Sequence, residues 1–228
     1  MIDFMATLIE NGPAWLERLR PALLMTLAVT AASFVAASLL AIGLELARQS
    51  RFKPARWATR GFIDFVRCVP ILAILYLLYF GLPGIGITFS SFVAGTVGLA
   101  LVYSTYLAEV LRGGVAAIPR GQREAALAAG FTPLMTFRFI VLPQALRVMA
   151  APLLVTFISL LKDSSICALI AVNELMLTSK VIMSETFMPL HVFVLVGAIY
   201  FAVAWPMSLL ARWIERRLAR ASRSAATP

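Results

Sequence analysis

The chain has 228 residues, of which 61% are hydrophobic and only 14% are charged, and its mean hydropathy is +0.90. Soluble domains contain about 45–50% apolar and about 25% charged residues, so the composition excludes that class and predicts an integral membrane protein. The net charge is +9, but the basic residues flank apolar segments and do not form one basic face, which argues against a nucleic-acid partner. Cys68 and Cys167 are isolated in apolar sequence, so neither a metal site nor a disulfide framework is predicted.

Five apolar segments are long enough to cross a membrane as helices, which takes about 20 mostly apolar residues. We place these segments at about residues 22–46, 68–82, 88–108, 148–171 and 191–211. The turn-forming sequence Gly81-Leu-Pro-Gly84 separates the second segment from the third. Residues 174–186 are expected to form a short helix outside the membrane. The predicted fold class is therefore all-α, with residues 1–228 forming one polytopic transmembrane domain of five helices.

Basic residues are distributed unevenly between the two sides of these segments. Sixteen lie in residues 45–67, in residues 109–147 and after the last span, whereas the opposite side carries only Arg18, Arg20, Lys162 and Lys180. Cytoplasmic loops of membrane proteins carry the excess of Lys and Arg. We therefore expect the N-terminus outside, the C-terminus in the cytoplasm and residues 112–147 in a cytoplasmic loop.

This loop contains the sequence EAALAAGFTPLMTFRFIVLP, from Glu124 to Pro143. Its alanine-rich start predicts a short helix, which Gly130 can end in a left-handed conformation. Thr132 then serves as the N-cap of a second helix, with a proline in the first turn. Leu142 precedes Pro143, so we expect that helix to end or kink there. The prediction is two short cytoplasmic helices joined by a tight corner.

The same segment resembles the EAA motif of the membrane subunits of bacterial ABC importers. Four further segments resemble those of polar amino acid permeases: Phe65-Val-Arg-Cys-Val-Pro70, Tyr106-Leu-Ala-Glu109 with Arg112-Gly-Gly114, Ile158-Ser-Leu-Leu-Lys-Asp163-Ser-Ser, and Glu174-Leu175. The chain departs from that family where Cys68 and Val69 replace a usual Gly-Thr, and where Ile74 stands in place of a common Gln.

The resemblance implies a MetI-like type I permease core in the bacterial inner membrane. Partners in such a complex are a dimer of ABC ATPase subunits, a second permease subunit (a copy or a relative), a periplasmic solute-binding protein and a polar amino acid substrate. The residues implied to couple this chain to the ATPase are Glu124, Ala125, Ala126, Gly130, Ile140, Leu142 and Pro143.

The chain has no phosphate-binding GxxxxGK[ST] sequence, so ATP and Mg²⁺ are expected in the separate ATPase and no cofactor in this chain. Neither HExxH nor GxSxG occurs, so we do not expect an enzyme. The alternative to an ATP-driven permease is a self-sufficient secondary carrier or channel, for which the resemblance to the EAA motif would be accidental.

Charged residues within the spans are the candidates for the substrate pathway, because a charge in a membrane is costly and usually faces a cavity or a partner. Asp163 lines the pathway at a helix break, or it forms a structural pair with Lys162, or the two mark the outer end of a short span. Ser164 follows and is included with them. Glu109 lines the pathway, or it pairs with Arg112 one helical turn away. If both carboxylates line the pathway, they favour a substrate with an ammonium group.

Overall fold

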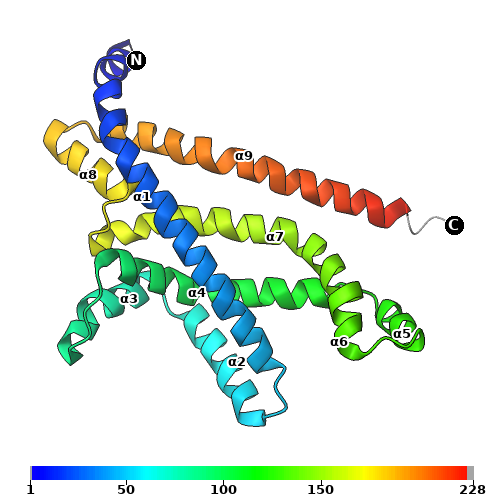
Figure 1. The fold of residues 1–228 in the computed structure, drawn as a ribbon. Coiled ribbons are helices and arrows are strands. Elements are labelled where there is room, and N and C mark those ends of the chain that lie inside the picture. The colour runs from blue at the N-terminus through cyan, green and yellow to red at the C-terminus, as the bar shows by residue number, and fades with distance from the viewer. Residues whose placement is uncertain (1, 225–228) are drawn as a thin grey trace.

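The computed structural model describes residues 2–224, and this part of the chain contains helices and no strand (Figure 1). The α-helices are α1 (Ile2–Arg48), α2 (Lys53–Cys68), α3 (Ile71–Tyr76), α4 (Ser91–Ala116), α5 (Arg120–Ala128), α6 (Pro133–Met135), α7 (Leu142–Asp163), α8 (Leu175–Thr186) and α9 (Pro189–Ser224). Two π-helical turns, Leu77–Gly81 and Thr136–Val141, and two 3₁₀ turns, Leu82–Ile85 and Ser164–Ile170, complete the chain.

Four helical segments are long and apolar enough to cross a membrane, namely Phe4–Arg48, Ser91–Ala116, Pro133–Ile170 and Pro189–Leu218. A fifth span arises if Lys53–Cys68 and Ile71–Ile85 count as one, although their axes differ by 102°. The polytopic all-α class is therefore confirmed. The bend has a local cause: Val69 precedes Pro70 and is extended, with φ −88° and ψ 130°, because a following proline disfavours the helical conformation.

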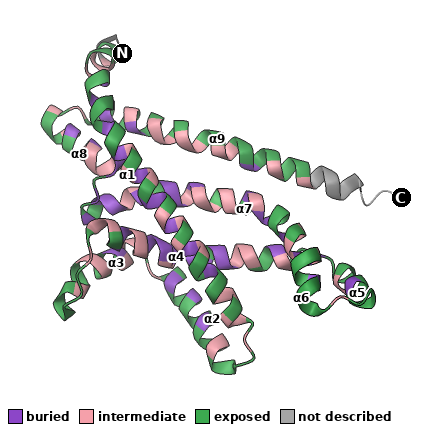
Figure 2. Cartoon of the chain, viewed as in Figure 1, coloured by how far each residue is buried: buried purple, intermediate pink, exposed green. Residues whose placement is uncertain are grey.

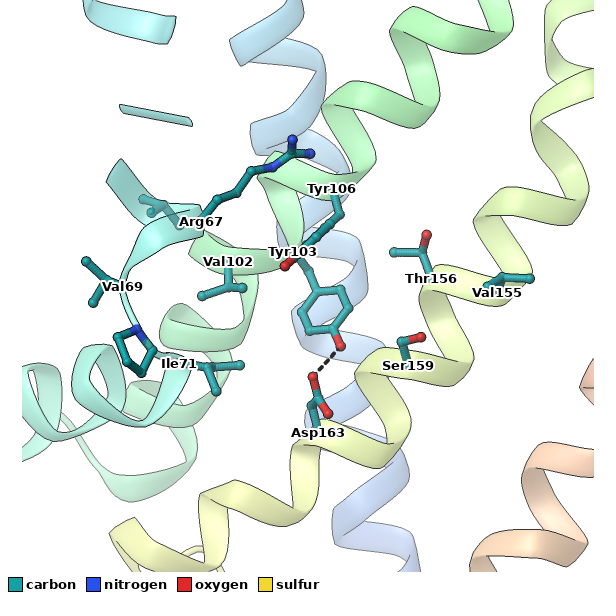
Figure 3. A pocket seen from close by; sticks show the side chains of 12 residues that line it. Arg67, Val69, Ile71, Val102, Tyr103, Tyr106, Val155, Thr156, Ser159 and Asp163 are labelled. Carbon is teal, nitrogen blue, oxygen red and sulfur yellow. Dashed lines mark hydrogen bonds between the residues drawn. The ribbon is translucent and has the colours of Figure 1, made fainter. Parts of the chain in front are cut away.

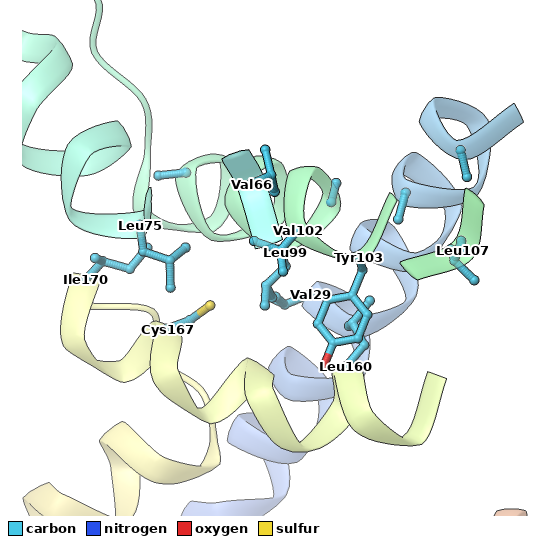
Figure 4. Close-up of a cluster of buried hydrophobic side chains, with 14 of the residues drawn as sticks. Val29, Val66, Leu75, Leu99, Val102, Tyr103, Leu107, Leu160, Cys167 and Ile170 are labelled. Atoms are coloured by element: carbon cyan, nitrogen blue, oxygen red, sulfur yellow. The ribbon is translucent and has the colours of Figure 1, made fainter. Parts of the chain in front are cut away.

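Helix α4 occupies the centre of the bundle and packs against α1, α3 and α7. Its side chains Leu99, Tyr103 and Leu107 join Val29 of α1 and Leu160 of α7 in the main buried cluster (Figure 4). Buried residues concentrate on α4 and the facing sides of its neighbours, whereas α9 is exposed over most of its length (Figure 2).

Gly98 of α4 shows why a small residue is needed in this core. A Cβ atom placed on Gly98 would lie 2.6 Å from Cδ2 of Leu75 in α3. Helices in lipid associate through close packing, which small residues permit. Gly98 therefore allows α3 to pack directly on α4, and α3 directly follows the bend next to the candidate site.

Helix α8 lies between the N-terminal part of α1 and the start of α9, as residues of all three helices share a second buried cluster. The carboxylate of Glu174, which is fully buried, caps α8 by accepting hydrogen bonds from the backbone N–H groups of Met176 (2.9 Å) and Leu177 (2.8 Å). It also accepts a hydrogen bond from the Tyr200 hydroxyl of α9 at 3.1 Å. The helix predicted over residues 174–186 is present, and Glu174 ties it to α9.

Candidate functional site

A cavity of about 490 Å³ lies between the bend that joins α2 to α3, the middle of α4 and the second half of α7 (Figure 3). Its lining residues are Val66, Arg67, Val69, Pro70, Ile71, Val102, Tyr103, Tyr106, Val155, Thr156, Ser159 and Asp163. Small-molecule sites in proteins have volumes of about 300–1,000 Å³ and combine apolar walls with a few polar groups. The size and the lining of this cavity fit such a site.

Asp163 is the acidic group of the cavity. It ends α7, where the backbone passes into the 3₁₀ turn, and its Oδ2 accepts a hydrogen bond of 2.7 Å from the Tyr103 hydroxyl of α4. Thr156 and Ser159 precede it on the same side of α7, at intervals of three and four residues, and face the cavity. The tyrosine orients the carboxylate, and Oδ1 has no hydrogen-bond partner within the described part of the chain.

Arg67 is the basic group of the cavity and comes from the last turn of α2. Its guanidinium donates a hydrogen bond of 3.0 Å to the carbonyl of Thr105 and lies 5.1 Å from the ring centre of Tyr106. In Figure 3 the guanidinium of Arg67 and the carboxylate of Asp163 lie toward opposite ends of the cavity. A cavity that presents one cation and one anion suits a zwitterion.

The sequence did not identify Arg67 as a site residue, although Arg67 belongs to the permease-like segment Phe65-Val-Arg-Cys-Val-Pro70 and to the basic residues that predict orientation. A signal was present, since Arg67 is the last charge before the uncharged stretch that extends to Glu109. An arginine at the edge of such a stretch, directly before the bend at Val69, is placed to reach into the bundle.

Lys162 and Ser164, the neighbours of Asp163, do not line this cavity. Lys162 is exposed and forms no ion pair with Asp163 among the residues that the structure describes, so no structural pair is observed there. Ser164 is fully buried, and its hydroxyl donates to the carbonyl of Leu161 at 2.8 Å.

Glu109 lies near the other end of α4 and is not part of the cavity lining. Its carboxylate pairs with Arg112, whose Nε lies 2.8 Å from Oε2, as the spacing of the two residues predicts. It also accepts a hydrogen bond of 2.8 Å from Arg48, at the end of α1. The structure thus brings Glu109 to a clamp between α1 and α4, and does not bring it near Asp163.

The predicted corner between the two short helices is present. Gly130 has φ +85°, its N–H bonds to the carbonyl of Leu127, and the N–H of Phe131 bonds to the carbonyl of Ala126. These two hydrogen bonds form a Schellman motif, which ends a helix through a left-handed residue. The Thr132 hydroxyl accepts a hydrogen bond from the N–H of Met135 at 3.3 Å, as expected of an N-cap.

Of the two outcomes expected at Leu142, an end or a kink, the structure shows the kink: the chain bends there but remains helical (Figure 1). The π-helical turn Thr136–Val141 joins α6 to α7, and the N–H of Leu142 bonds to the carbonyl of Phe137, five residues earlier. Pro143 lacks an N–H, and in a regular α-helix its ring would clash with the carbonyl of Phe139. The wider π turn relieves this clash, so the helix continues.

The residues of the motif differ in exposure. Glu124, Ala125, Gly130 and Pro143 are exposed, Ile140 and Leu142 are half-buried, and Ala126 is buried. Large apolar side chains are exposed beside them: Leu134 is 74% exposed and Phe139 is 57% exposed. The corner therefore presents small residues together with unpaired apolar side chains, which is typical of a surface that binds another protein.

An all-α chain with four to five apolar spans, a cavity within the bundle and a helical corner outside the spans defines a polytopic membrane protein of the transporter type. Residues 35–220 match the family of binding-protein-dependent transport system inner membrane components. The chain belongs to this family.

The relatives agree with the family. The chain is 33% identical over 211 residues to the probable glutamine ABC transporter permease protein GlnM of Bacillus subtilis; this alignment covers 92% of this chain and 96% of GlnM. It is 30% identical over 218 residues to the arginine transport system permease protein ArtQ of the same organism; this alignment covers 95% of this chain and 97% of ArtQ. Among solved structures, an amino acid ABC transporter crystallised with histidines has a TM-score of 0.84 and 31% identity, covering 95% of this chain and 99% of that one. The MetNI methionine ABC transporter, at 18% identity and a TM-score of 0.66, shows the same fold.

Proposed function

We propose that this permease moves a polar amino acid into the cytoplasm through the cavity at Asp163, driven by a separate ATPase that binds at residues 120–143. The observation that carries the proposal is the pair of opposite charges, Arg67 and Asp163, in one cavity of amino-acid size. The relatives support the substrate class, since their names include transporters of glutamine, arginine and cystine.

Each charge of the cavity has a counterpart on an α-amino acid. The carboxylate of Asp163 accepts hydrogen bonds from the ammonium group, and the guanidinium of Arg67 binds the carboxylate. Such charge-assisted hydrogen bonds are shorter and stronger than neutral ones. Tyr103 holds Asp163 in place through their hydrogen bond. Of the acidic residues that the sequence suggested for the pathway, we retain Asp163 and assign Glu109 to the clamp between α1 and α4.

Coupling is assigned to the corner formed by α5 and α6. Glu124, Ala125 and Gly130 are exposed there, and small side chains let a partner approach the backbone closely. With the N-terminus outside and the C-terminus inside the bacterial inner membrane, this corner lies in the cytoplasm, where an ATPase dimer with its Mg²⁺ and ATP can bind it. A second permease subunit and a periplasmic solute-binding protein complete the proposed complex. A self-sufficient carrier or channel finds no support, because the family is that of binding-protein-dependent systems.

The cavity assignment is tested by uptake into proteoliposomes that contain the complete transporter. We expect Asp163→Asn to weaken transport about tenfold to a hundredfold, because a hydrogen bond to a charged group contributes about 1.5–3 kcal/mol. The ATPase should still co-purify. Lys162→Gln is the matched control, since it removes the neighbouring charge, which is exposed and outside the cavity. Unchanged affinity and rate for Asp163→Asn would return this residue to a structural role.

The coupling assignment is tested separately by extraction of the tagged permease in mild detergent. We expect an ATPase to co-purify with the unaltered chain and to be lost with Glu124→Lys or Gly130→Asp, while insertion into the membrane is retained. Transport by a preparation without any ATPase would contradict the assignment.

A further inference from the structure

Helix α2 carries a line of basic side chains on one side. Lys53, Arg56, Arg60 and Arg67 follow one another at intervals of three, four and seven residues, which place them on the same side of a helix. We call these four residues the basic stripe. It covers about 21 Å of helix, at 1.5 Å per residue. Asp64 is the single acidic residue of α2, and it lies on this side too, four residues after Arg60 and three before Arg67.

The other sides of α2 have different compositions. Thr59, Ile63 and Val66 are buried against α1 and α4. Trp57 and Phe65 lie on a third side, where they are 73% and 67% exposed, as suits contact with lipid. The basic stripe therefore lies between the packed side and the exposed apolar side of the helix and borders both.

One residue of the stripe lines the cavity, and the other three lie on the same side of α2 farther toward its N-terminus. Arg67 is at once the last residue of the stripe and a lining residue of the cavity that contains Asp163. None of the four basic residues forms an ion pair within residues 4–218, and the nearby carboxylate of Glu109 is bound by Arg48 and Arg112. The excess of basic residues in cytoplasmic segments explains their number, but any side of α2 would satisfy that rule. Their alignment with Arg67 is a separate observation.

We infer that the basic stripe lines the inner half of the substrate pathway and that the substrate is an acidic amino acid, with a second carboxylate on its side chain. This inference rests on the proposed function, because it takes the cavity as the substrate site. A row of like charges beside a narrow path creates a field that attracts the opposite charge and repels its own. Two carboxylates and one ammonium group give a net negative substrate, which the stripe attracts, whereas the net positive charge of a basic amino acid is repelled.

The test is competition for the permease purified with its co-expressed ATPase in nanodiscs, without a solute-binding protein. Radiolabelled L-glutamate is the probe, and L-aspartate, L-glutamine and L-arginine are the competitors. We expect half-displacement by L-aspartate at a concentration at least tenfold below that of L-glutamine or L-arginine. Arg56→Gln and Arg60→Gln should each reduce this preference about fivefold. Arg212→Gln, which removes an exposed charge on α9 away from α2, should leave the preference unchanged.

The outcomes separate this inference from the proposed function. Suppose that L-glutamine or L-arginine displaces the label as effectively as L-aspartate, and that Asp163→Asn abolishes binding. This result would overturn the inference of an acidic substrate and retain the cavity as the substrate site. An unchanged preference in both stripe variants would likewise overturn the role of the stripe. If no labelled amino acid, whether glutamate, glutamine or arginine, binds to the complex, the cavity itself is not the substrate site and both proposals fail.

Discussion

The corner between α5 and α6 depends on one backbone conformation, so it offers a graded test of coupling. Gly130 has φ +85°, and a Cβ atom added there would have no neighbour within 4 Å. A substitution at this position therefore changes the backbone preference without creating a steric clash. Alanine in the left-handed region costs about 1–2 kcal/mol, whereas asparagine is tolerated better and a β-branched valine is tolerated least.

These costs translate into affinity for the ATPase. A cost of 1–2 kcal/mol changes an equilibrium between formed and unformed corners by a factor of about 5–30, and apparent affinity falls with the fraction of chains in the binding conformation. We expect the affinity for the ATPase to decrease in the order glycine, asparagine, alanine, valine at position 130. Gly130→Ala should reduce this affinity at least fivefold. Binding of purified ATPase to immobilised permease nanodiscs, measured by interferometry, gives these affinities.

The control for this series is Gly61→Ala. Gly61 lies in α2, outside residues 120–143, with a negative φ, and an added Cβ atom there would also have no neighbour within 4 Å. Alanine favours the helix at this position, so no loss of affinity is expected. Equal affinity of the alanine, asparagine and wild-type forms at position 130 would refute the reasoning. So would an equal loss at position 61, because the loss would then not depend on the backbone of the corner.

Three further predictions concern stability and pH. Gly98→Val should lower the melting temperature of the detergent-solubilised protein, since its side chain would clash with Leu75 and overpacking of a core costs about 1–3 kcal/mol; an unchanged temperature would mean that α3 moves freely. Glu174→Ala should destabilise by about 1–2 kcal/mol through loss of the α8 cap, and amide exchange should rise in α8 first. The guanidinium of Arg18 lowers the pKa of the Glu185 carboxyl below its usual range, chiefly by hydrogen bonding. The small stabilisation of the folded protein by this ion pair is therefore complete above the ordinary pKa of a glutamate and is lost as the pH falls through the lowered pKa of Glu185. A Glu185→Gln variant should then be less stable than the wild type near neutral pH and equally stable in acid.

The features that the sequence predicted are those that depend on local composition. Four long apolar helices follow from long uncharged stretches, whereas the segment expected at residues 68–82 is found only as part of a pair bent by 102°. The corner follows from Gly130, which permits a left-handed backbone, and from Thr132 and the proline after it, which favour the start of a helix. The pairing of Glu109 with Arg112 also lies within one helical turn. Local rules were sufficient in each of these cases.

The features that were missed depend on distant parts of the chain. Asp163 bonds to Tyr103, sixty residues earlier, and no periodicity indicates that partner. Glu174 was expected only as the first residue of a short external helix, and nothing in the sequence showed that it is fully buried; its hydrogen bonds to α8 and to Tyr200 offset the cost of burying a carboxylate. At Leu142 the sequence left an end and a kink open, because a proline is compatible with both, and only the structure shows the π turn that relieves the clash and lets the helix continue.

That continuation bears on the proposed coupling. The helical segment Pro133–Ile170 begins at the corner assigned to the ATPase and contains Asp163 near its other end. Along α7 the distance from Pro143 to Asp163 is about 30 Å, at 1.5 Å per residue. A helix transmits displacement along its axis because its backbone hydrogen bonds hold successive turns together, and the π turn at Thr136–Val141 is the irregular point where the corner can change angle against α7. Under the proposed function, a displacement of the corner can reach the cavity without a relay through several side chains, since one helical segment contains both.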